Sequence, residues 1–208
     1  MPQSTIHLKG ETYEVYSTGN PVIRALNRRF LRAVSDELAS FGASALLGLD
    51  LGCGEAHMLS ALKEAGAIGR VAAVDLDRER IECAAAENPV ADYVLSDATR
   101  LPFADGSFDY VLAAEILEHL PDADSAMSEI CRVCADGGRI VLTVPYEPFF
   151  HWGNVLRGKH LRRWGWTPAH VNRWTRSEAR RFLERYVEVT GEKAIATFPW
   201  LLFSTRKA

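Results

Sequence analysis

The sequence predicts an α/β protein in which helices cover both faces of a doubly wound, mostly parallel sheet of seven strands, the last of them antiparallel. Short, nearly continuous apolar runs, of the kind found in strands buried on both faces, alternate with helical stretches. The central helical stretches end at stop signals, namely Gly66, Asn88-Pro89 and Asp136-Gly137-Gly138. With no repeat and no dividing linker, this alternation predicts one domain over residues 1–208.

The elements can be assigned in chain order from their patterns. The expected strands are 45–51, 70–76, 92–97, 108–114, 139–145, a segment near 186–190, and 200–206. The expected helices between them are 55–65, 78–87 and 122–135. A first helix over 21–41 has an apolar face formed by Val22, Leu26, Phe30, Val34, Leu38 and Phe41. A last helix follows the capping box Thr175-x-x-Glu178 and carries the apolar stripe Ala179, Phe182, Leu183 and Tyr186.

The composition is that of an ordinary globular domain. The chain has 208 residues, 48% of them hydrophobic and 25% charged, which is enough for one sizeable core. A net charge of −3 does not favour a nucleic-acid partner. No apolar run approaches the ~18 residues of a membrane span, and the first residues lack an apolar signal core. We therefore expect a cytoplasmic protein.

Two cysteines have the spacing of a metal or redox motif. Cys131 and Cys134 form C-R-V-C, which zinc sites and thioredoxin-like sites both use. With Met127 and Ile130, however, they follow the i, i+3, i+4, i+7 stripe of a helix. No second cysteine pair or clustered histidine pair completes a tetrahedral site. We expect buried thiols, and the sequence predicts no metal.

The stretch LDLGCGEAHM, residues 49–58, predicts a strand that runs into a glycine turn and then a helix. A dinucleotide fingerprint, G-x-G-x-x-G, would need its last glycine at position 57, where the chain has His57. Asp50 instead lies where a cationic ligand, unlike a pyrophosphate, is favoured. Gly52 and Gly54 allow unusual backbone dihedrals and close approach of a ligand. The alternative is a plain strand-to-helix turn.

Polar residues also follow the next three strands, and in a parallel sheet these strand ends share one edge. Asp75 lies about 20 residues beyond the glycine turn, where a carboxylate can accept from ribose hydroxyls. Its alternative role is to cap the helix that begins near Asp77. Asp97 follows the third strand, and its alternative is a turn aspartate. The polar segment 115–119 follows the fourth strand.

Together with LPFADGSFDYVLAAEILEHLPD, these motifs resemble the class I S-adenosylmethionine (SAM) dependent methyltransferases over residues 46–145, in particular small ones of ubiquinone and menaquinone biosynthesis. Ala56 departs mildly from the family's D/E-x-G-x-G-x-G motif. The resemblance implies a Rossmann-like sheet, SAM as cofactor and S-adenosylhomocysteine (SAH) as product. It implies that Asp97 accepts from the adenine amine, that the Ala98 amide approaches the ring, and that Glu115 contacts the amino or ribose end. The implied cofactor-binding residues are Asp50, Gly52, Cys53, Gly54, Asp75, Leu76, Asp97, Ala98 and Glu115.

A sulfonium methyl group is already activated, so rate comes mostly from holding the nucleophile in line. His119, near the end of the fourth strand, is the candidate general base, since a histidine titrates near neutral pH. The alternative is a histidine at a helix start, satisfied by the backbone. Glu118 could be a residue that faces the solvent, and we take this as its expected position.

Two segments outside the shared core are candidates for substrate recognition. Residues 1–20 can form a lid that carries Tyr13 and Tyr16, or a disordered tail. The insert 146–175 starts on the ligand side of the sheet and is the expected substrate platform. Its candidate substrate-binding residues are His151, Trp152, Arg162, Arg163, Arg173 and Trp174.

The stretch 157–185 is basic, although the chain is acidic. It contains nine lysines or arginines against Glu178 and Glu184, and four of the five tryptophans lie in or beside it. Cations with amphipathic rings suit an acceptor with an anionic head and an apolar body, or docking at an anionic membrane. The alternative is a solvated arginine face with tryptophans that pack the insert onto the sheet. No RNA-binding module accompanies the stretch.

The sequence therefore predicts a methyltransferase acting on a small-molecule or lipid-linked acceptor. Two alternatives remain: a non-catalytic SAM-binding partner or regulatory protein, and an NAD(P)-dependent oxidoreductase, which His57 disfavours. Neither the acceptor nor the oligomeric state follows from the sequence.

Overall fold

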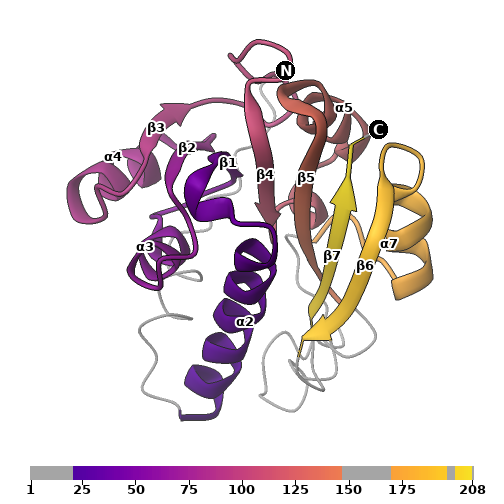
Figure 1. The fold of residues 1–208 in the computed structure, drawn as a ribbon, viewed down its shortest axis with the longest axis horizontal. Helices are drawn as coiled ribbons and strands as arrows, with labels where there is room; N and C mark the ends of the chain where they lie inside the picture. Colours follow the sequence, from indigo (N-terminus) through magenta and orange to yellow (C-terminus); the bar gives the residue numbers. More distant parts are fainter. Residues whose placement is uncertain (1–20, 147–169, 196–199, 208) are drawn as a thin grey trace.

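The computed structural model describes residues 21–146, 170–195 and 200–207, and these build one seven-stranded sheet (Figure 1). The strand order is β3-β2-β1-β4-β5-β7-β6. Strand β7 is antiparallel to both of its neighbours, and the other adjacent pairs are parallel. The strands are β1 (Leu47–Leu51), β2 (Arg70–Asp75), β3 (Asp92–Leu95), β4 (Phe108–Ala114), β5 (Cys134–Pro145), β6 (Glu188–Ile195) and β7 (Trp200–Arg206). The predicted fold class is confirmed.

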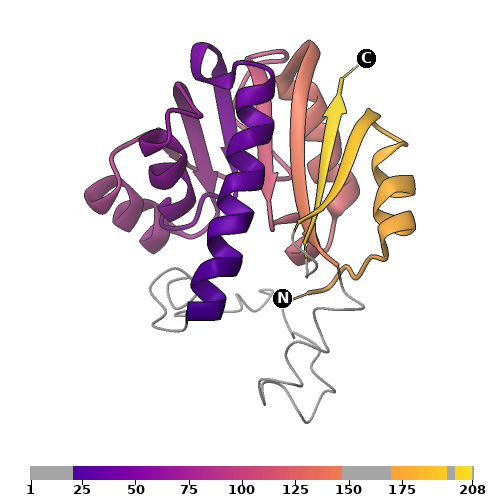
Figure 2. The ribbon, with the colours of Figure 1, turned by 60° about the horizontal axis from the view of Figure 1, so that its bottom comes forward.

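Helices cover both faces of this sheet, as Figures 1 and 2 show. Buried residues of α2, α3 and α4 form a hydrophobic cluster with side chains on one face of the sheet. Buried residues of α5 and α7 form a second cluster with side chains on the opposite face. Figure 2 shows α2 lying across its face of the sheet. The helices are α2 (Pro21–Ser40), α3 (His57–Glu64), α4 (Arg78–Glu87), α5 (Ala123–Val133) and α7 (Arg176–Leu183), with 3₁₀ turns η1 (Ala43–Ala45) and η2 (Leu117–His119).

Side-chain caps explain where three helices begin. The Asp77 carboxylate accepts from two backbone amides in the first turn of α4. Asp122 accepts from the amide of Ser125 at the start of α5. The predicted capping box of Thr175 and Glu178 is present at the start of α7. Each cap satisfies amides that lack a partner inside the helix, which is typically worth about 1 kcal/mol.

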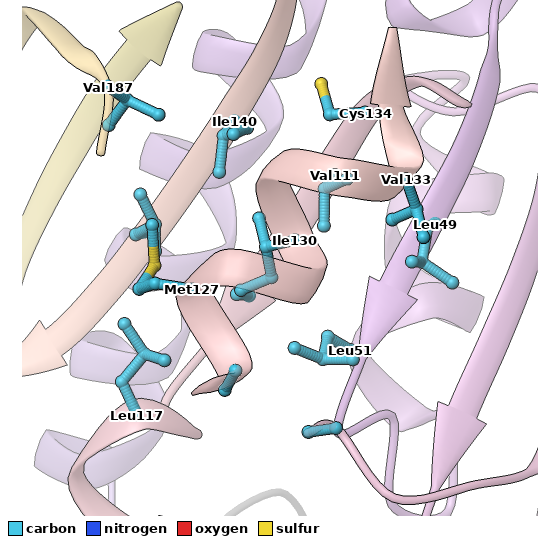
Figure 3. Packing of buried hydrophobic residues seen from close by; sticks show 14 of the residues in the cluster. Leu49, Leu51, Val111, Leu117, Met127, Ile130, Val133, Cys134, Ile140 and Val187 are labelled. Atoms are coloured by element: carbon cyan, nitrogen blue, oxygen red, sulfur yellow. The ribbon is translucent and has the colours of Figure 1, made fainter. Parts of the chain in front are cut away.

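The cluster around α5 is the larger core (Figure 3). Met127, Ile130 and Val133 of α5 are fully buried against Leu49 and Val111 of the central strands. Burial of each large apolar side chain contributes roughly 1.5–3 kcal/mol. The positions agree with the helical period predicted for this segment.

Three local expectations were wrong. Helix α5 ends at Val133, so Cys134 is the first residue of β5 and lies opposite Phe108 of β4 instead of continuing the helix. Strand β6 extends to Ile195, because it pairs with β7 along its length. Val22 is 65% exposed, so the buried face of α2 begins later than expected. In each case tertiary pairing or its absence overrides the local pattern.

The strand order reverses between β1 and β4, which pair with each other. From β1 the chain proceeds outward to β2 and β3, whereas from β4 it proceeds to β5 on the other side. In such sheets the ligand crevice lies beyond the carboxyl ends of the strands at this switch point. Among the described residues, no helix is long and apolar enough to cross a membrane.

Candidate functional site

The glycine turn after β1 is held by the neighbouring strand. The amides of Gly52 and Cys53 both donate to the carbonyl of Val74 in β2, at 2.8 and 3.0 Å. Gly52 and Gly54 have φ values of 77° and 56°, in the left-handed region that favours glycine. A Cβ on Gly54 would meet no atom within 4 Å, so this part of the turn is open to a ligand.

The opposite side of the turn meets the segment after β4. A Cβ on Gly52 would lie 2.5 Å from Cδ1 of Ile116, and this close contact and the positive φ both favour glycine here. Ala56 takes φ 61° immediately before α3, at the position where the resemblance expects glycine. His57 begins α3, and its Nε2 lies 3.1 Å from the Glu55 carboxylate. The large side chain of His57 therefore occupies the position where a dinucleotide-binding fingerprint has glycine, which disfavours a bound dinucleotide.

Asp50 in β1 is 2% exposed, and among the described residues neither of its carboxylate oxygens has a hydrogen-bond partner. Burial, and secondarily the charge of Asp75, raises the pKa of Asp50 to about 7. A buried carboxylate is costly unless a positive charge or hydrogen-bond donors compensate it. The site thus presents a buried group that a cationic ligand can satisfy.

Asp75 at the end of β2 ties two turns together. Its Oδ2 accepts from the amide of Gly54 and its Oδ1 from the amide of Asp77, both at 2.9 Å. The helix cap itself is Asp77, so Asp75 is not the N-cap of α4. Two carboxylate oxygens offer about four acceptor positions, which leaves capacity for ligand hydroxyls. The neighbouring Leu76 is 69% exposed, and its apolar side chain lies at the same strand end.

Asp97, beyond β3, is an exposed turn residue. Its Oδ1 accepts from both the amide and the hydroxyl of Thr99, at 2.8 Å each. Ala98 is buried. Asp97 therefore stabilises a turn, as the alternative interpretation predicts. The Oδ2 atom of Asp97 takes no part in these two hydrogen bonds.

Glu115, directly after β4, also takes a left-handed conformation, with φ 55°. Its Oε1 accepts from the Thr143 hydroxyl of β5 at 3.1 Å, and its Oε2 from Nε1 of Trp200 in β7 at 2.8 Å. The carboxylate is thus anchored toward β5 and β7, on the side of the switch point away from Asp75. Thr143 and Trp200 could not be found from the sequence, because both lie far from Glu115 along the chain.

His119 ends the short helix η2, and its side chain is 33% exposed. Its Nε2 lies 3.9 Å from Oε1 of Glu118, and its ring centroid lies 5.1 Å from that of His170. The expectation of a solvent-facing Glu118 was wrong, since only 1% of this residue is exposed. Residues Val171 and Asn172 pack over it, because both of their amides donate to the Glu118 carbonyl.

Most of the predicted substrate-binding residues lie outside the described residues. This is true of Tyr13, Tyr16, His151, Trp152, Arg162 and Arg163, and of the proposed lid 1–20. Arg173 is exposed. Trp174 stacks on Phe182 of α7 at 5.1 Å. The stacking agrees with the alternative that tryptophans pack this segment onto the fold.

The basic residues of α7 are largely paired with acids. Arg176 and Arg180 both contact the Glu192 carboxylate of β6. Arg185 pairs with Asp124 at 2.8 Å and lies over the ring of Phe182. These pairs support the interpretation of residues 176–185 as a solvated arginine face.

The two cysteines of C-R-V-C are not reactive thiols. Cys134 is buried and Cys131 is half-buried. Burial raises the pKa of both thiols, that of Cys134 to about 11. Both therefore stay protonated at neutral pH, as expected for thiols of the core.

Comparison with known proteins identifies the shared core. Residues 49–142 match the family described as "Methyltransferase domain". Over these residues, the chain is similar to methyltransferase domains. It is 37% identical over 100 residues to "Methyltransferase GfsG" of Streptomyces halstedii, covering 45% of this chain and 36% of the relative. It is 33% identical over 139 residues to "Demethylmenaquinone methyltransferase" of Beutenbergia cavernae, covering 64% and 56% respectively.

The chain thus spans about a third to a little over half the length of these two relatives. The fold extends further than the sequence match. The N-methyltransferase NodS from Bradyrhizobium japonicum, solved in complex with SAH, has a TM-score of 0.68 at 19% identity, covering 91% of this chain and 89% of NodS. The predicted resemblance to class I methyltransferases is confirmed.

Proposed function

We propose that this protein transfers the methyl group of SAM to a small-molecule or lipid-linked acceptor and releases SAH. The observation that carries this proposal is the buried Asp50 carboxylate beside a glycine turn at the switch point. SAM contains an ammonium group and a sulfonium, and a cationic ligand offsets the cost of this carboxylate. NAD offers a pyrophosphate, which Asp50 would repel.

The residues around the turn fit the remainder of SAM. Gly52, Cys53 and Gly54 provide a close backbone approach, and Gly54 has open space beside it. Asp75 has acceptor capacity for ribose hydroxyls. Leu76 offers an exposed apolar surface to a ring. Asp97 and the Ala98 amide are the groups proposed to bind the adenine edge.

The acceptor side is proposed to lie beyond β4. SAM, when bound, supplies an activated methyl group, so the chain's own residues need mainly to orient the acceptor and remove its proton. His119, partly exposed after β4, is proposed as the base for an oxygen or nitrogen acceptor. Glu115 is proposed to position the cofactor's amino or ribose end through its carboxylate, which Thr143 and Trp200 anchor.

An anionic head on the acceptor would suit the basic residues Arg162, Arg163 and Arg173, with aromatic contacts from Tyr13, Tyr16, His151, Trp152 and Trp174. The same proposal includes contact of these residues with an anionic membrane surface. It does not include binding of nucleic acid. Replacing the three arginines with Ala should raise the acceptor KM, or abolish liposome binding, at unchanged SAM affinity. Wild-type behaviour in both assays would exclude this role.

Calorimetry with SAM, SAH and NAD tests the cofactor. We expect micromolar binding of SAM and SAH and none of NAD, and the reverse result would overturn the proposal. Incubation with labelled SAM and cell extract then tests turnover. SAM binding with no labelled product from any acceptor would indicate a non-catalytic SAM-binding protein instead.

His119→Ala tests the base. Loss of a general base lowers turnover by roughly 100-fold or more, while SAM affinity stays nearly intact. A parallel loss of folding stability and activity would instead assign His119 a structural role.

A further inference from the structure

Three side chains beyond β4 form a compact group of metal-binding donors. One ligand atom from each of Glu118, His119 and His170 can be chosen so that all three lie within 4.8 Å of one another. Glu118 and His170 are buried and His119 is half-buried. His119 and His170 are 51 positions apart in the chain, so no sequence spacing shows that they meet.

The second half of this group is held firmly against the first. The amides of Val171 and Asn172 donate to the Glu118 carbonyl at 2.9 and 3.0 Å. The Asn172 side-chain amide donates to the carbonyls of Leu117 and Leu120 at 3.0 and 2.6 Å. Four hydrogen bonds therefore fix the segment that carries His170 on η2. Donors positioned by backbone contacts lose little freedom when they bind an ion.

The donor types select a class of cation. Two imidazoles and one carboxylate suit zinc and neighbouring first-row transition metals, whereas calcium and magnesium prefer oxygen ligands. Tetrahedral coordination at about 2.0–2.1 Å requires donors roughly 3.3 Å apart. Side-chain rotations that bring the ligand atoms closer by up to about 1.5 Å from their present spacing of 4.8 Å or less would reach this separation. The nearly fully buried Glu118 supplies negative charge in a medium of low dielectric, where it attracts a cation most strongly.

We propose that Glu118, His119 and His170 bind one divalent transition-metal cation of the zinc class. Glu115 is not part of this set, because its carboxylate is anchored by Thr143 and Trp200. Three protein ligands leave at least one coordination position for an oxygen from outside the chain, which is the arrangement of catalytic zinc sites.

The metal site adds a catalytic group to the proposed function. The catalytic role of the cation rests on that proposed function. An acceptor hydroxyl that binds the cation has a lowered pKa and releases its proton to water. Its oxygen lone pair then forms the new bond to the methyl carbon while the C–S bond breaks and leaves its electron pair on sulfur. With the cation bound, His119 would act as a metal ligand and not as the base, since a nitrogen bound to a metal cannot accept a proton. The lowered pKa of the bound hydroxyl would then allow water to take the proton.

Metal binding can be measured without any methyl acceptor. The chelator-treated full chain is titrated with Zn²⁺ by calorimetry and with Co²⁺ by visible absorption, which reports the coordination geometry. We expect one ion per chain and the intense absorption of tetrahedral Co²⁺. Glu118→Gln and His170→Ala should each weaken Zn²⁺ binding at least 100-fold.

His57→Ala is the matched control, because His57 also lies beside a carboxylate, at 3.1 Å from Glu55, but outside the cluster. This variant should bind Zn²⁺ like the wild type. SAH affinity and the thermal melt of each variant report whether it is folded. Equal Zn²⁺ affinity in the wild type, Glu118→Gln and His170→Ala, or no binding at micromolar Zn²⁺, would overturn the proposal.

The metal site and the proposed function fail separately. Zn²⁺ binding without SAM binding would remove the methyltransferase proposal and leave the metal site. SAM-dependent turnover that a chelator does not reduce would remove the catalytic role of the cation and leave His119 as the base.

Discussion

The two sides of the switch point are built differently. On the β1–β2 side, Asp50, the glycine turn and Asp75 lie within 26 consecutive residues, and Asp75 contacts the turn through a backbone amide. On the β4 side, Glu115 meets Trp200, and His119 meets His170. The first side is a local construction, whereas the second is assembled from distant parts of the chain. We infer that the β1–β2 part of the proposed cofactor site tolerates changes in the C-terminal part of the chain, whereas Glu115 and the proposed acceptor side do not.

The largest expected effect concerns Asp50. The folded protein holds a proton on this carboxyl up to a pKa of about 7, whereas in the unfolded chain it ionises near 3.9. Without ligand, this group therefore lowers the stability of the fold as the pH rises from about 4 to about 7. Asp50→Asn removes the loss and should be more stable than the wild type by up to about 4 kcal/mol at pH 8, and equal to it at pH 4.

Urea denaturation at pH 4, 6 and 8 measures this difference. Carboxyls that do not interact with Asp50 contribute equally to both proteins and cancel in the comparison. The same variant should bind SAM more weakly, since it cannot supply the negative charge. Parallel pH curves for the two proteins would show that Asp50 is not desolvated as described.

The second expected effect concerns Asp75, on the β1–β2 side of the switch point. Asp75→Ala removes proposed hydrogen bonds to ribose and should weaken SAM binding by ~1.5–3 kcal/mol, as expected for bonds to a charged group. The variant also loses the acceptor for Gly54 and Asp77, so the turn itself loosens. Asp75→Asn keeps one acceptor oxygen and should show a smaller loss in calorimetry. Wild-type affinity in Asp75→Ala would leave Asp75 with a role in the turn only.

The third effect concerns the distant side. Trp200→Phe keeps an aromatic ring to pack on Phe30, whose centroid lies 5.0 Å away, and removes the donor to Glu115 together with the pyrrole part of the indole. Loss of a hydrogen bond to a charged acceptor should cost about 1.5–3 kcal/mol of unfolding free energy. Thermal and urea unfolding measure it, with Glu115→Gln as the partner in a double-mutant cycle. Additive losses in that cycle would mean that the two side chains are not coupled.

The smallest effect tests the departure at position 56. Ala56→Gly relieves a left-handed alanine, by about 1–2 kcal/mol, but loses a buried methyl group, worth about 0.8 kcal/mol, and adds freedom to the unfolded chain. These terms nearly cancel, so the unfolding free energy should change by no more than about 0.5 kcal/mol. Ala56→Val, with a branched side chain at positive φ, should cost about 2 kcal/mol. A gain of more than about 1 kcal/mol from glycine would mean that the strain at Ala56 exceeds the expected ~1–2 kcal/mol.

The order of strands and helices was predictable because local patterns dominate in this fold. Buried parallel strands appear as apolar runs, and stop signals separate them from helices, as at Gly66 and Asn88. The boundary at Cys134 was not predictable. Its helical spacing agrees with α5, but pairing with Phe108 of β4 places it in a strand.

The arrangement of the β1–β2 side, which is the proposed cofactor side, could be predicted from the sequence because its residues are close together in the chain. Asp50, Gly52, Gly54 and Asp75 follow one strand–turn–helix–strand unit, so their spacing already implies their proximity. Only the tertiary structure decided the β4 side. Packing of residues 170–172 on η2 buries Glu118 and brings His170 to His119, and the β5–β7 pairing brings Trp200 to Glu115. The His119–His170 contact joins residues 51 positions apart, and the Glu115–Trp200 bond joins residues 85 positions apart. No sequence pattern predicts such contacts, because they depend on how separate elements pack.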